Sequence, residues 1–150
     1  MIEVRQMQRD RVSELFDMMK TFYQSPALEH PVDDGTLRRT LGDALAGSPG
    51  LYGYQLIVDD VLAGFGFVVR YYSTEVGGYT VQFEDLYLLP EYRGHGVGTS
   101  YFKTVMQMFP EARRFRLEVT EGNTDARRLY ERLGFRHLGY TQMIYDVPTK

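Results

Sequence analysis

The sequence contains no cysteine and no tryptophan, and its positive and negative charges almost balance. Without cysteine the chain can form no disulfide, hold no metal through thiolates and use no cysteine nucleophile. A formal net charge of −3 gives no electrostatic footprint for nucleic acid. No apolar run approaches the roughly 20 residues that a membrane-spanning helix needs. The first ten residues are too polar for a signal peptide, so we expect a cytoplasmic protein that binds neither membrane nor nucleic acid.

The composition that remains is that of a folded protein. Hydrophobic residues make up 43% of the chain and charged residues 25%, which argues against disorder. A length of 150 residues suits one domain with one core, so we expect a single domain over 1–150. The 12 tyrosines combine apolar area with a hydroxyl group, which suits both cores and wet pockets.

Hydrophobic periodicity in the first third of the chain predicts one strand followed by two helices. Residues 2–7 alternate in polarity, as a strand does. From Asp10, a plausible N-cap, to residue 23 the apolar side chains recur on one helical face. Pro26 and Pro31 mark a loop, and a second helix is expected to follow Asp34 and to end near Gly47.

The middle of the sequence predicts three antiparallel strands, over 52–58, 62–72 and 79–89. The turns between them fall at Asp59-Asp60 and at Gly77-Gly78. Gly64 and Gly66, inside the second of these strands, suggest a bend or a bulge.

The last third predicts a helix over 97–109, a strand over 115–119, a helix over 126–133 that Gly134 ends, and a final strand over 138–147. The strand 79–89, the helix and the strand 115–119 form a βαβ crossover. The element order therefore predicts an α/β (α+β) fold, with a mixed, mostly antiparallel sheet of six to seven strands flanked by about four helices.

A glycine-rich loop at 91–99 joins a predicted strand to a predicted helix and is the main chemical signal. Gly94, Gly96 and Gly98 stand at alternate positions, where missing β-carbons let a ligand approach the backbone. The helix after the loop presents free N–H groups and the positive end of its dipole, and Arg93 adds a fixed charge. The loop therefore predicts a site for a phosphate or pyrophosphate.

Three loop types bind phosphates in this way, and only one fits the sequence. The dinucleotide fingerprint G-x-G-x-x-G fails because Thr99 occupies its third glycine position. The P-loop fails because no lysine precedes Thr99. The pattern R-x-x-G-x-G is met by Arg93, Gly96 and Gly98.

The run 84–98, EDLYLLPEYRGHGVG, resembles the central motif of the GNAT N-acetyltransferase superfamily. The run 123–135 resembles that superfamily's second motif, N-x-x-A-x-x-x-Y-x-x-x-G-F. Two motifs in the right order are far more specific than one glycine loop, and the predicted element order matches the family fold along almost the whole chain.

The resemblance implies that acetyl-CoA lies in a wedge between two splayed parallel strands, here 84–89 and 115–119. The backbone of the first strand pairs with the pantetheine arm, the loop amides hold the pyrophosphate, and two residues of the second motif line the far side of the arm. The implied acetyl-CoA-binding residues are Leu86, Tyr87, Leu88, Arg93, Gly94, His95, Gly96, Val97, Gly98, Thr99, Asn123 and Ala126.

The resemblance also implies two catalytic residues. Tyr130 matches the family's general acid near the cofactor sulfur, although its place on the apolar helix face is equally that of a core residue. Glu84 is the candidate general base, acting directly or through a water. Asp85 is adjacent, and which of the two carboxylates faces the cleft depends on a bulge that the sequence does not locate. His30 and His137 have no partner at metal-ligand spacing, so we predict no metal site.

Within the superfamily, residues 83–87 resemble most the spermidine/spermine (diamine) acetyltransferase branch. We therefore expect transfer of an acetyl group from acetyl-CoA to the primary amine of a small molecule, such as a polyamine or an amino-acid-like amine. Transfer to a protein N-terminus or a lysine, a non-catalytic acetyl-CoA-binding module and a structural subunit that docks through its aromatic-rich strands remain open. A homodimer that pairs through residues 138–147 is open as well.

Overall fold

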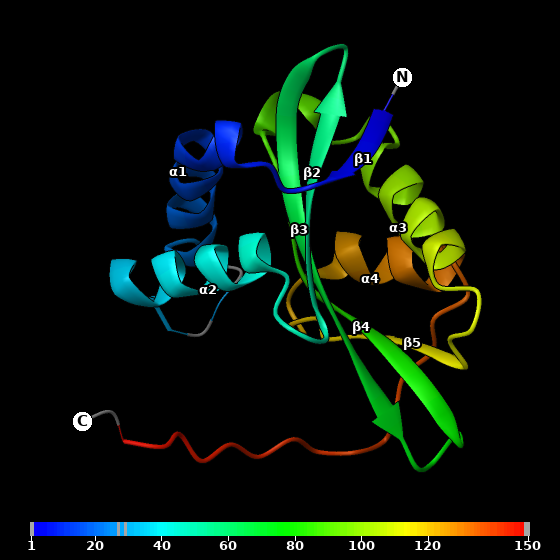
Figure 1. Cartoon of the computed structure of the whole chain (residues 1–150). Helices are drawn as coiled ribbons and strands as arrows, with labels where there is room; N and C mark the ends of the chain where they lie inside the picture. The colour runs from blue at the N-terminus through cyan, green and yellow to red at the C-terminus, as the bar shows by residue number, and fades with distance from the viewer. Residues whose placement is uncertain (1, 27, 29, 149–150) are drawn as a thin grey trace.

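The computed structural model describes residues 2–26, 28 and 30–148. Positions 27 and 29, within the loop that Pro26 and Pro31 mark, lie outside the described residues. Figure 1 shows a twisted sheet with helices on both faces. In chain order the elements are β1 (Ile2–Gln6), a 3-10 turn (Arg9–Arg11), α1 (Val12–Tyr23), α2 (Asp34–Ala46), β2 (Leu51–Val58), β3 (Val61–Ser73), β4 (Gly78–Leu88), a second 3-10 turn (Pro90–Tyr92), α3 (Val97–Met108), β5 (Arg114–Leu117) and α4 (Thr124–Arg132).

The strands lie in the order β1-β2-β3-β4-β5, and every neighbouring pair is antiparallel except β4 and β5, which are parallel. The predicted α/β fold, its mixed and mostly antiparallel sheet and its βαβ crossover through α3 are confirmed. The sheet has five strands in the described part of the chain, fewer than the six to seven expected.

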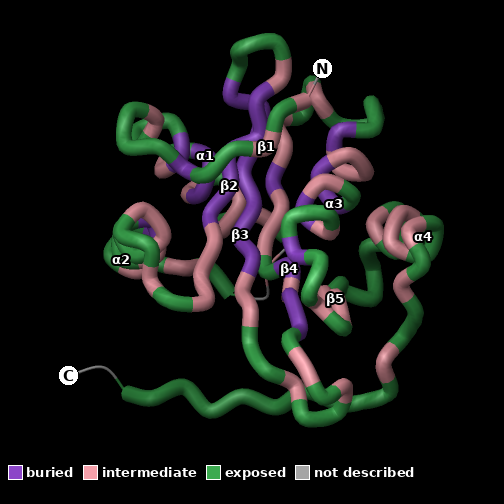
Figure 2. Tube along the Cα trace, turned by 45° about the vertical axis from the view of Figure 1, so that its right-hand side comes forward, coloured by how far each residue is buried: buried purple, intermediate pink, exposed green. Residues whose placement is uncertain are grey.

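The missing strand is the one predicted over 138–147. Between 135 and 148 the chain has no regular structure and runs away from the body (Figures 1 and 2). Its alternating apolar side chains are present, but they are exposed: Met143 by 93%, Tyr145 by 85% and Val147 by 80%. The predicted strand over 138–147 is therefore wrong for a single copy of this chain. Alternating polarity makes a segment able to form a strand, but only the edge of a neighbouring strand supplies its hydrogen-bond partners.

The two N-terminal helices begin differently from one another. Asp10 is not the N-cap of α1, because it lies inside the 3-10 turn that precedes the helix. By contrast, α2 starts on Asp33, whose carboxylate accepts a 2.8 Å hydrogen bond from the Thr36 amide, and it ends on Gly47 with φ +74°. A side-chain cap and a left-handed glycine thus define both ends of α2 as the sequence predicts.

Each face of the sheet carries its own hydrophobic core. On one face α1 and α2 bury Leu15, Met19 and Leu37 against Phe65 of β3. On the other face α3 packs its aromatic side chains against β4, and α4 covers their edge. Figure 2 shows the buried stretches concentrated in the central strands, between these two layers. The two faces therefore meet at β4, the strand that carries the first sequence motif.

Two bulges interrupt the sheet on either side of β3. The β2–β3 register shifts between Leu56 and Ile57 and leaves Ala63 as an extra residue, next to Gly64. A β-carbon on Gly64 would stand 2.1 Å from the carbonyl oxygen of Tyr87. The bulge that the glycine suggests is therefore real, and the glycine itself lets β3 approach β4 closely.

We expect Gly64→Ala to lower the free energy of unfolding by about 3 kcal/mol, because a methyl group would overlap backbone that cannot move aside. Gly42→Ala is the matched control, since a β-carbon there meets nothing within 4 Å on α2. It should raise the free energy of unfolding by about 1 kcal/mol through helix propensity. Urea unfolding monitored by circular dichroism measures both; equal stabilities for the two variants would contradict the close approach of β3 and β4.

Candidate active site

The site begins where β4 and β5 separate. Their parallel ladder runs from the Thr80–Arg114 pair to the Phe83–Leu117 pair and then stops, while β4 continues to Leu88. The edge of β4 beyond Phe83 therefore has no strand beside it in the described part of the chain. This is the wedge that the sequence resemblance implies.

Backbone groups on this free edge can be assigned from the hydrogen bonds of β4. The Leu89 amide donates to the Ala63 carbonyl of β3 at 2.8 Å, and the Tyr87 carbonyl faces Gly64 of β3. Because antiparallel residues alternate in direction, Leu86 and Leu88 point their amide and carbonyl groups toward the wedge. The backbone of Tyr87 faces β3 instead, and its ring lies in the core on the α1 face, so the expectation for Tyr87 does not fit this geometry.

Arg93 closes the end of this edge. Its Nε donates a 2.9 Å hydrogen bond to the Leu88 carbonyl, and its guanidinium lies 5.5 Å from the centre of the Tyr87 ring. The side chain thus ties the loop after β4 back onto the strand. Arg93 therefore fixes the loop at the entrance of the wedge, and its guanidinium lies at the end of β4.

The second bulge falls at Glu84 and decides which carboxylate faces which way. Phe83 pairs with Val68 and Asp85 with Phe67, so Glu84 has no partner on β3. Because one extra residue reverses the alternation, Phe83 belongs to the α3 core while Asp85 turns to the α1 face. Glu84 stands between them, one position past the last β4–β5 pair.

Glu84 is exposed, yet its surroundings favour the neutral form. Partial desolvation raises the pKa of the Glu84 carboxyl above its ordinary value, and the carboxylates of Asp85 and Glu118 raise it further. Gln82 holds Glu118 in place through a 3.2 Å hydrogen bond across the β4–β5 ladder. A carboxylate with a raised pKa at the mouth of the wedge is suited to accept a proton from an amine.

Asp85 has a different environment. It accepts a hydrogen bond from the hydroxyl of Tyr23, the last residue of α1. Burial raises the pKa of the Asp85 carboxyl, and the Tyr23 hydrogen bond opposes that shift. Burial and the Asp85 carboxylate raise the pKa of the Tyr23 phenol far above its ordinary value, so Tyr23 remains a donor at any working pH.

The glycine loop forms an open cradle at the start of α3. Gly94 and Gly96 have φ values of +77° and +80°, and a β-carbon on either meets nothing within 4 Å. Gly98 differs, because its β-carbon would lie 3.7 Å from Leu129 and 3.8 Å from Leu86, which is ordinary contact. The left-handed conformation therefore needs glycine at 94 and 96, and their bare side faces open space.

The amides of the cradle have no side-chain cap. Gly96 is the N-cap of α3 and makes no capping hydrogen bond, whereas Asp33 caps α2 and Asn123 caps α4. Val97 turns its side chain into the core, and His95 is exposed, so both contribute to the loop through their backbone. The first amides of α3, at Val97 to Thr99, are therefore available to an anion, with the helix dipole aligned toward it.

The second motif lies on α4. Tyr130 packs its ring edge-to-face on Phe102 and Phe135, with centroids 5.4 and 6.2 Å away. Its hydroxyl makes no hydrogen bond to another described residue, and burial raises the pKa of the phenol. Asn123 accepts a 3.3 Å hydrogen bond from the Ala126 amide, so this pair shapes the start of α4. The ring of Tyr130 is core, and its hydroxyl group is free to act.

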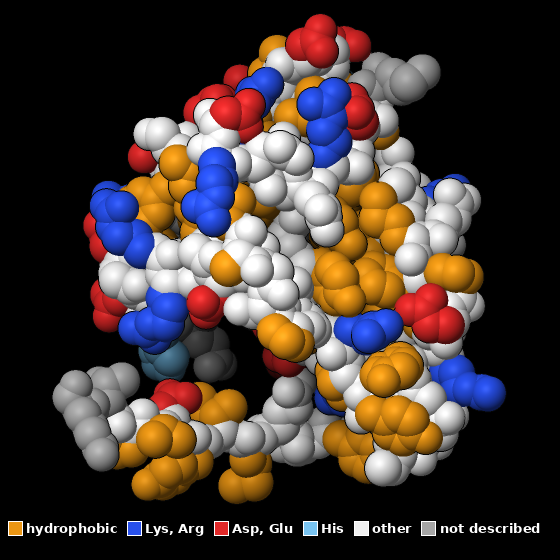
Figure 3. Space-filling model, in the orientation of Figure 1, with side chains coloured by type: hydrophobic (Ala, Val, Ile, Leu, Met, Phe, Trp, Pro, Cys, Tyr) orange, Lys and Arg blue, Asp and Glu red, His pale blue; other side chains and the backbone are white. Residues whose placement is uncertain are grey.

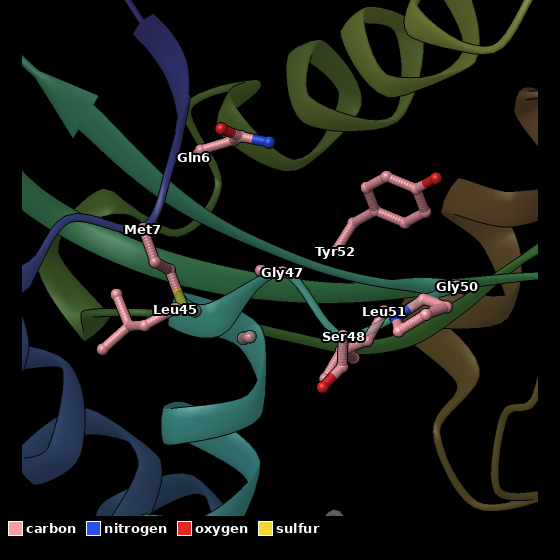
Figure 4. A pocket seen from close by; sticks show the side chains of 11 residues that line it. Gln6, Met7, Leu45, Gly47, Ser48, Gly50, Leu51 and Tyr52 are labelled. Carbon is pink, nitrogen blue, oxygen red and sulfur yellow. The ribbon is translucent and has the colours of Figure 1, made fainter.

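Several other features lie away from this site. Arg114 pairs with Glu75, and Arg113 packs on Gly78, both at the distal end of the β3–β4 hairpin. Figure 4 shows a hollow between the end of α2 and the start of β2, which no acidic or basic residue lines. The described residues contain no group of three potential metal ligands and no helix long and apolar enough to cross a membrane.

Sequence reasoning missed the contribution of two tyrosines. Tyr23 reads as one more apolar position of α1, and nothing in its spacing indicates a carboxylate partner 62 residues away. Tyr101 is fully buried on α3, and its hydroxyl has no hydrogen-bond partner in the described structure. It occupies the space left by Gly66, where a β-carbon would stand 2.1 Å away. Gly66 was the only signal for this contact, and it does not name its neighbour.

Comparisons with known proteins agree with this geometry. Residues 12–135 match the acetyltransferase (GNAT) family. The mouse (Mus musculus) thialysine N-epsilon-acetyltransferase is 38% identical over 80 residues, which are 52% of this chain and 46% of that protein. The chain thus spans about half the length of the relatives that it matches in sequence.

Two solved structures show the same fold at low identity. A possible acetyltransferase from Clostridium difficile 630 aligns with a TM-score of 0.83 and 18% identity over 99% of both chains. A predicted acetyltransferase with acetyl-CoA from Clostridium acetobutylicum aligns with a TM-score of 0.77 and 18% identity, over 97% of this chain and 96% of that one. With the family match over residues 12–135, the chain belongs to the GNAT acetyltransferase family.

Proposed function

We propose that this protein transfers an acetyl group from acetyl-CoA to the primary amine of a small molecule. The observation that carries the proposal is the uncapped start of α3, with two left-handed glycines, next to the unpaired edge of β4. The start of α3 suits a pyrophosphate, and the unpaired edge of β4 suits a peptide-like arm. Acetyl-CoA contains both groups. When bound, this cosubstrate supplies a thioester as the acetyl donor.

We infer that the cofactor-binding residues act together along the length of acetyl-CoA. The amides from Gly94 to Thr99 hold the pyrophosphate, and the backbone groups of Leu86 together with the Leu88 amide hold the arm, while the Leu88 carbonyl accepts from Arg93. Asn123 and Ala126, which are hydrogen-bonded to one another at the start of α4, are the residues proposed to line the other side of the arm. The thioester is thereby delivered to the place where Glu84 stands on β4.

Two residues handle the protons. Glu84 takes the proton from the ammonium form of the acceptor, directly or through a water, because only a neutral amine can attack. Tyr130 donates to the departing sulfur through its free hydroxyl, which the raised pKa keeps protonated. The amine attacks directly, so the chain needs no covalent nucleophile.

We expect Glu84→Gln to lower kcat about 100-fold and to remove the acid limb of the pH profile. Activity of the parent should fall as the pH drops through the raised pKa of Glu84, because protonation abolishes the base. Glu118→Gln is the matched control: it removes a neighbouring carboxylate, so the acid limb should persist and move to lower pH. An acid limb that is unchanged in Glu84→Gln would assign the base elsewhere.

The acceptor that the comparisons favour is a short amine with an ordinary alkylammonium group. The relatives with matching sequence are named for the N-epsilon group of thialysine, and the carboxylates of Glu84, Asp85 and Glu118 favour a cation. Thiol release should be assayed with acetyl-CoA and thialysine, lysine, a diamine, a polyamine, an aminoglycoside and a peptide with a free N-terminus. Turnover confined to the peptide would replace the small-amine proposal by protein acetylation.

The same assay separates the remaining alternatives. A non-catalytic module would gain thermal stability with CoA but release no thiol from any amine. A structural subunit would show neither response. The presence of both Glu84 and the free hydroxyl of Tyr130 favours the enzyme.

Residues 138–147 support a homodimer, because they carry a strand pattern without a strand partner among the described residues. Figure 3 shows hydrophobic side chains of this segment standing clear of the body. A second copy provides both an identical segment and the free edge of the short strand β5. We expect a dimeric mass by light scattering for the full chain and a monomeric mass for Ile144→Lys/Tyr145→Lys; equal masses would exclude this segment as the interface.

One catalytic domain over 1–150 and a cytoplasmic location also stay predictions.

A further inference from the structure

Tyr23 and Asp85 form the polar contact between the end of α1 and the bulge of β4. The phenol hydroxyl donates to the Asp85 carboxylate, and both residues are half-buried. The Tyr23 ring lies edge-on to Phe22 at 5.0 Å, and Phe22 in turn contacts Phe65 and Tyr87. The apolar contacts thus seat α1 on the sheet, while the hydrogen bond fixes its last residue opposite Asp85.

The residues directly after Tyr23 line a hollow at the end of α1. The Ser25 amide donates to the Phe22 carbonyl at 3.0 Å, so the chain continues directly from the fixed end of the helix. A hollow opens there, lined by Tyr23, Gln24, Ser25, Pro26, Leu28 and Pro31. Glu84, adjacent to Asp85 in sequence, stands at the mouth of the wedge. The hydrogen bond therefore joins the hollow at the end of α1 to the strand that carries the proposed base.

We propose that Tyr23 and Asp85 are a positioning pair, which holds the hollow at the end of α1 in register with Glu84 so that the acceptor amine reaches the base. This inference rests on the proposed function. It gives the two adjacent carboxylates different roles. Glu84 accepts the proton of the amine, whereas Asp85 positions the hollow at the end of α1 through its hydrogen bond with Tyr23. The bulge makes this division possible because it sends Asp85 to the α1 face.

Charge around the pair agrees with a fixed hydrogen bond. The titratable groups near Asp85 are Tyr23 on α1, Glu84 on β4 and Tyr101 on α3, and both phenols stay protonated at working pH. Asp85 therefore has one hydrogen-bond donor, Tyr23, and one neighbouring carboxylate, Glu84. Because the Asp85 carboxylate already accepts the Tyr23 hydrogen bond, taking a proton from substrate would compete with that contact.

Tyr23→Phe tests the pair, because it keeps the ring packing and removes only the hydroxyl. We expect the KM for the acceptor amine to rise about 10-fold, which is the effect of one hydrogen bond worth about 1.4 kcal/mol. The KM for acetyl-CoA should change less than about twofold on the same scale. Asp85→Ala should give the same pattern, and Tyr23→Phe/Asp85→Ala should be no worse than Asp85→Ala alone.

Asp85→Asn is the conservative variant, since its side-chain oxygen still accepts from Tyr23. It should restore most of the acceptor KM and move the acid limb of the pH profile to lower pH, because Glu84 loses a negative neighbour. Deuterium uptake over residues 20–26 provides a readout without turnover, and Tyr23→Phe should increase it while Asp85→Asn should not.

An unchanged acceptor KM in Tyr23→Phe, independent effects that multiply in the double variant, or an equal rise in the KM for acetyl-CoA would each overturn the proposal. Unchanged uptake over 20–26 would overturn it even if no amine were acetylated. Absence of turnover by the parent chain with all amines, together with increased uptake in Tyr23→Phe, would instead reject the proposed function and retain the contact at the end of α1.

Discussion

Gly96→Val is expected to weaken CoA binding about 100-fold, as measured by isothermal titration calorimetry. The valine side chain would enter the open space in front of the α3 amides, where a pyrophosphate has to approach. Loss of two hydrogen bonds to a charged group, at about 1.5 kcal/mol each, corresponds to that factor. Gly96 also has φ +80°, so the valine should cost about 1–2 kcal/mol of folding stability as well.

Two controls separate the loss of binding from the loss of stability. Gly77 has φ +64° and an equally open surrounding, but it lies in the β3–β4 turn at the other end of β4. Gly77→Val should therefore lose similar stability and keep its CoA affinity. Gly98→Ala should keep both, because its methyl group only contacts Leu86 and Leu129. Unaltered CoA affinity in Gly96→Val would remove the main support for the cradle.

Tyr130→Phe is expected to lower kcat about 100-fold, which is the usual loss on removing a general acid. The ring should keep its contacts with Phe102 and Phe135, so we expect the melting temperature to stay within about 2 °C of the parent. The hydroxyl makes no hydrogen bond to the described residues, and its removal leaves no buried partner unsatisfied. CoA affinity should likewise stay near that of the parent.

Tyr92→Phe is a suitable comparison, because it removes a phenol hydroxyl from the same core without touching the proposed machinery. Rates should be measured with saturating acetyl-CoA by thiol release. Equal kcat values for Tyr130→Phe, Tyr92→Phe and the parent would make Tyr130 a core residue only, which is the alternative that its place on the apolar face of α4 allows.

The structure around the glycine loop was predictable from local sequence. Strand, loop and helix around Gly94 and Gly96 were predictable because left-handed turns need glycine, and because proline ends β4 where the periodicity changes. The second motif was equally readable, since Asn123 caps α4 and Gly134 ends it. In both cases the determining forces act between residues close in sequence.

The directions of the Glu84 and Asp85 carboxylates were not predictable from local sequence. Glu84 and Asp85 look equivalent in sequence, and only the pairing of β3 with β4 makes Glu84 the unpaired residue. The contact of Asp85 with Tyr23 depends on how α1 lies over that bulge. Both are consequences of long-range packing, which fixes register through side chains that are distant along the chain.

The sequence alone predicted the element order as far as α4, the glycine loop before α3 and the family, because periodicity, glycine conformations and helix caps are local properties. The tertiary structure decided the direction of the carboxylates, which backbone groups of β4 point away from β3, and the lack of regular structure over residues 138–147. Each of these depends on whether a partner from another part of the chain is present, because a hydrogen-bonding edge or an apolar side chain is satisfied only by the groups that lie beside it.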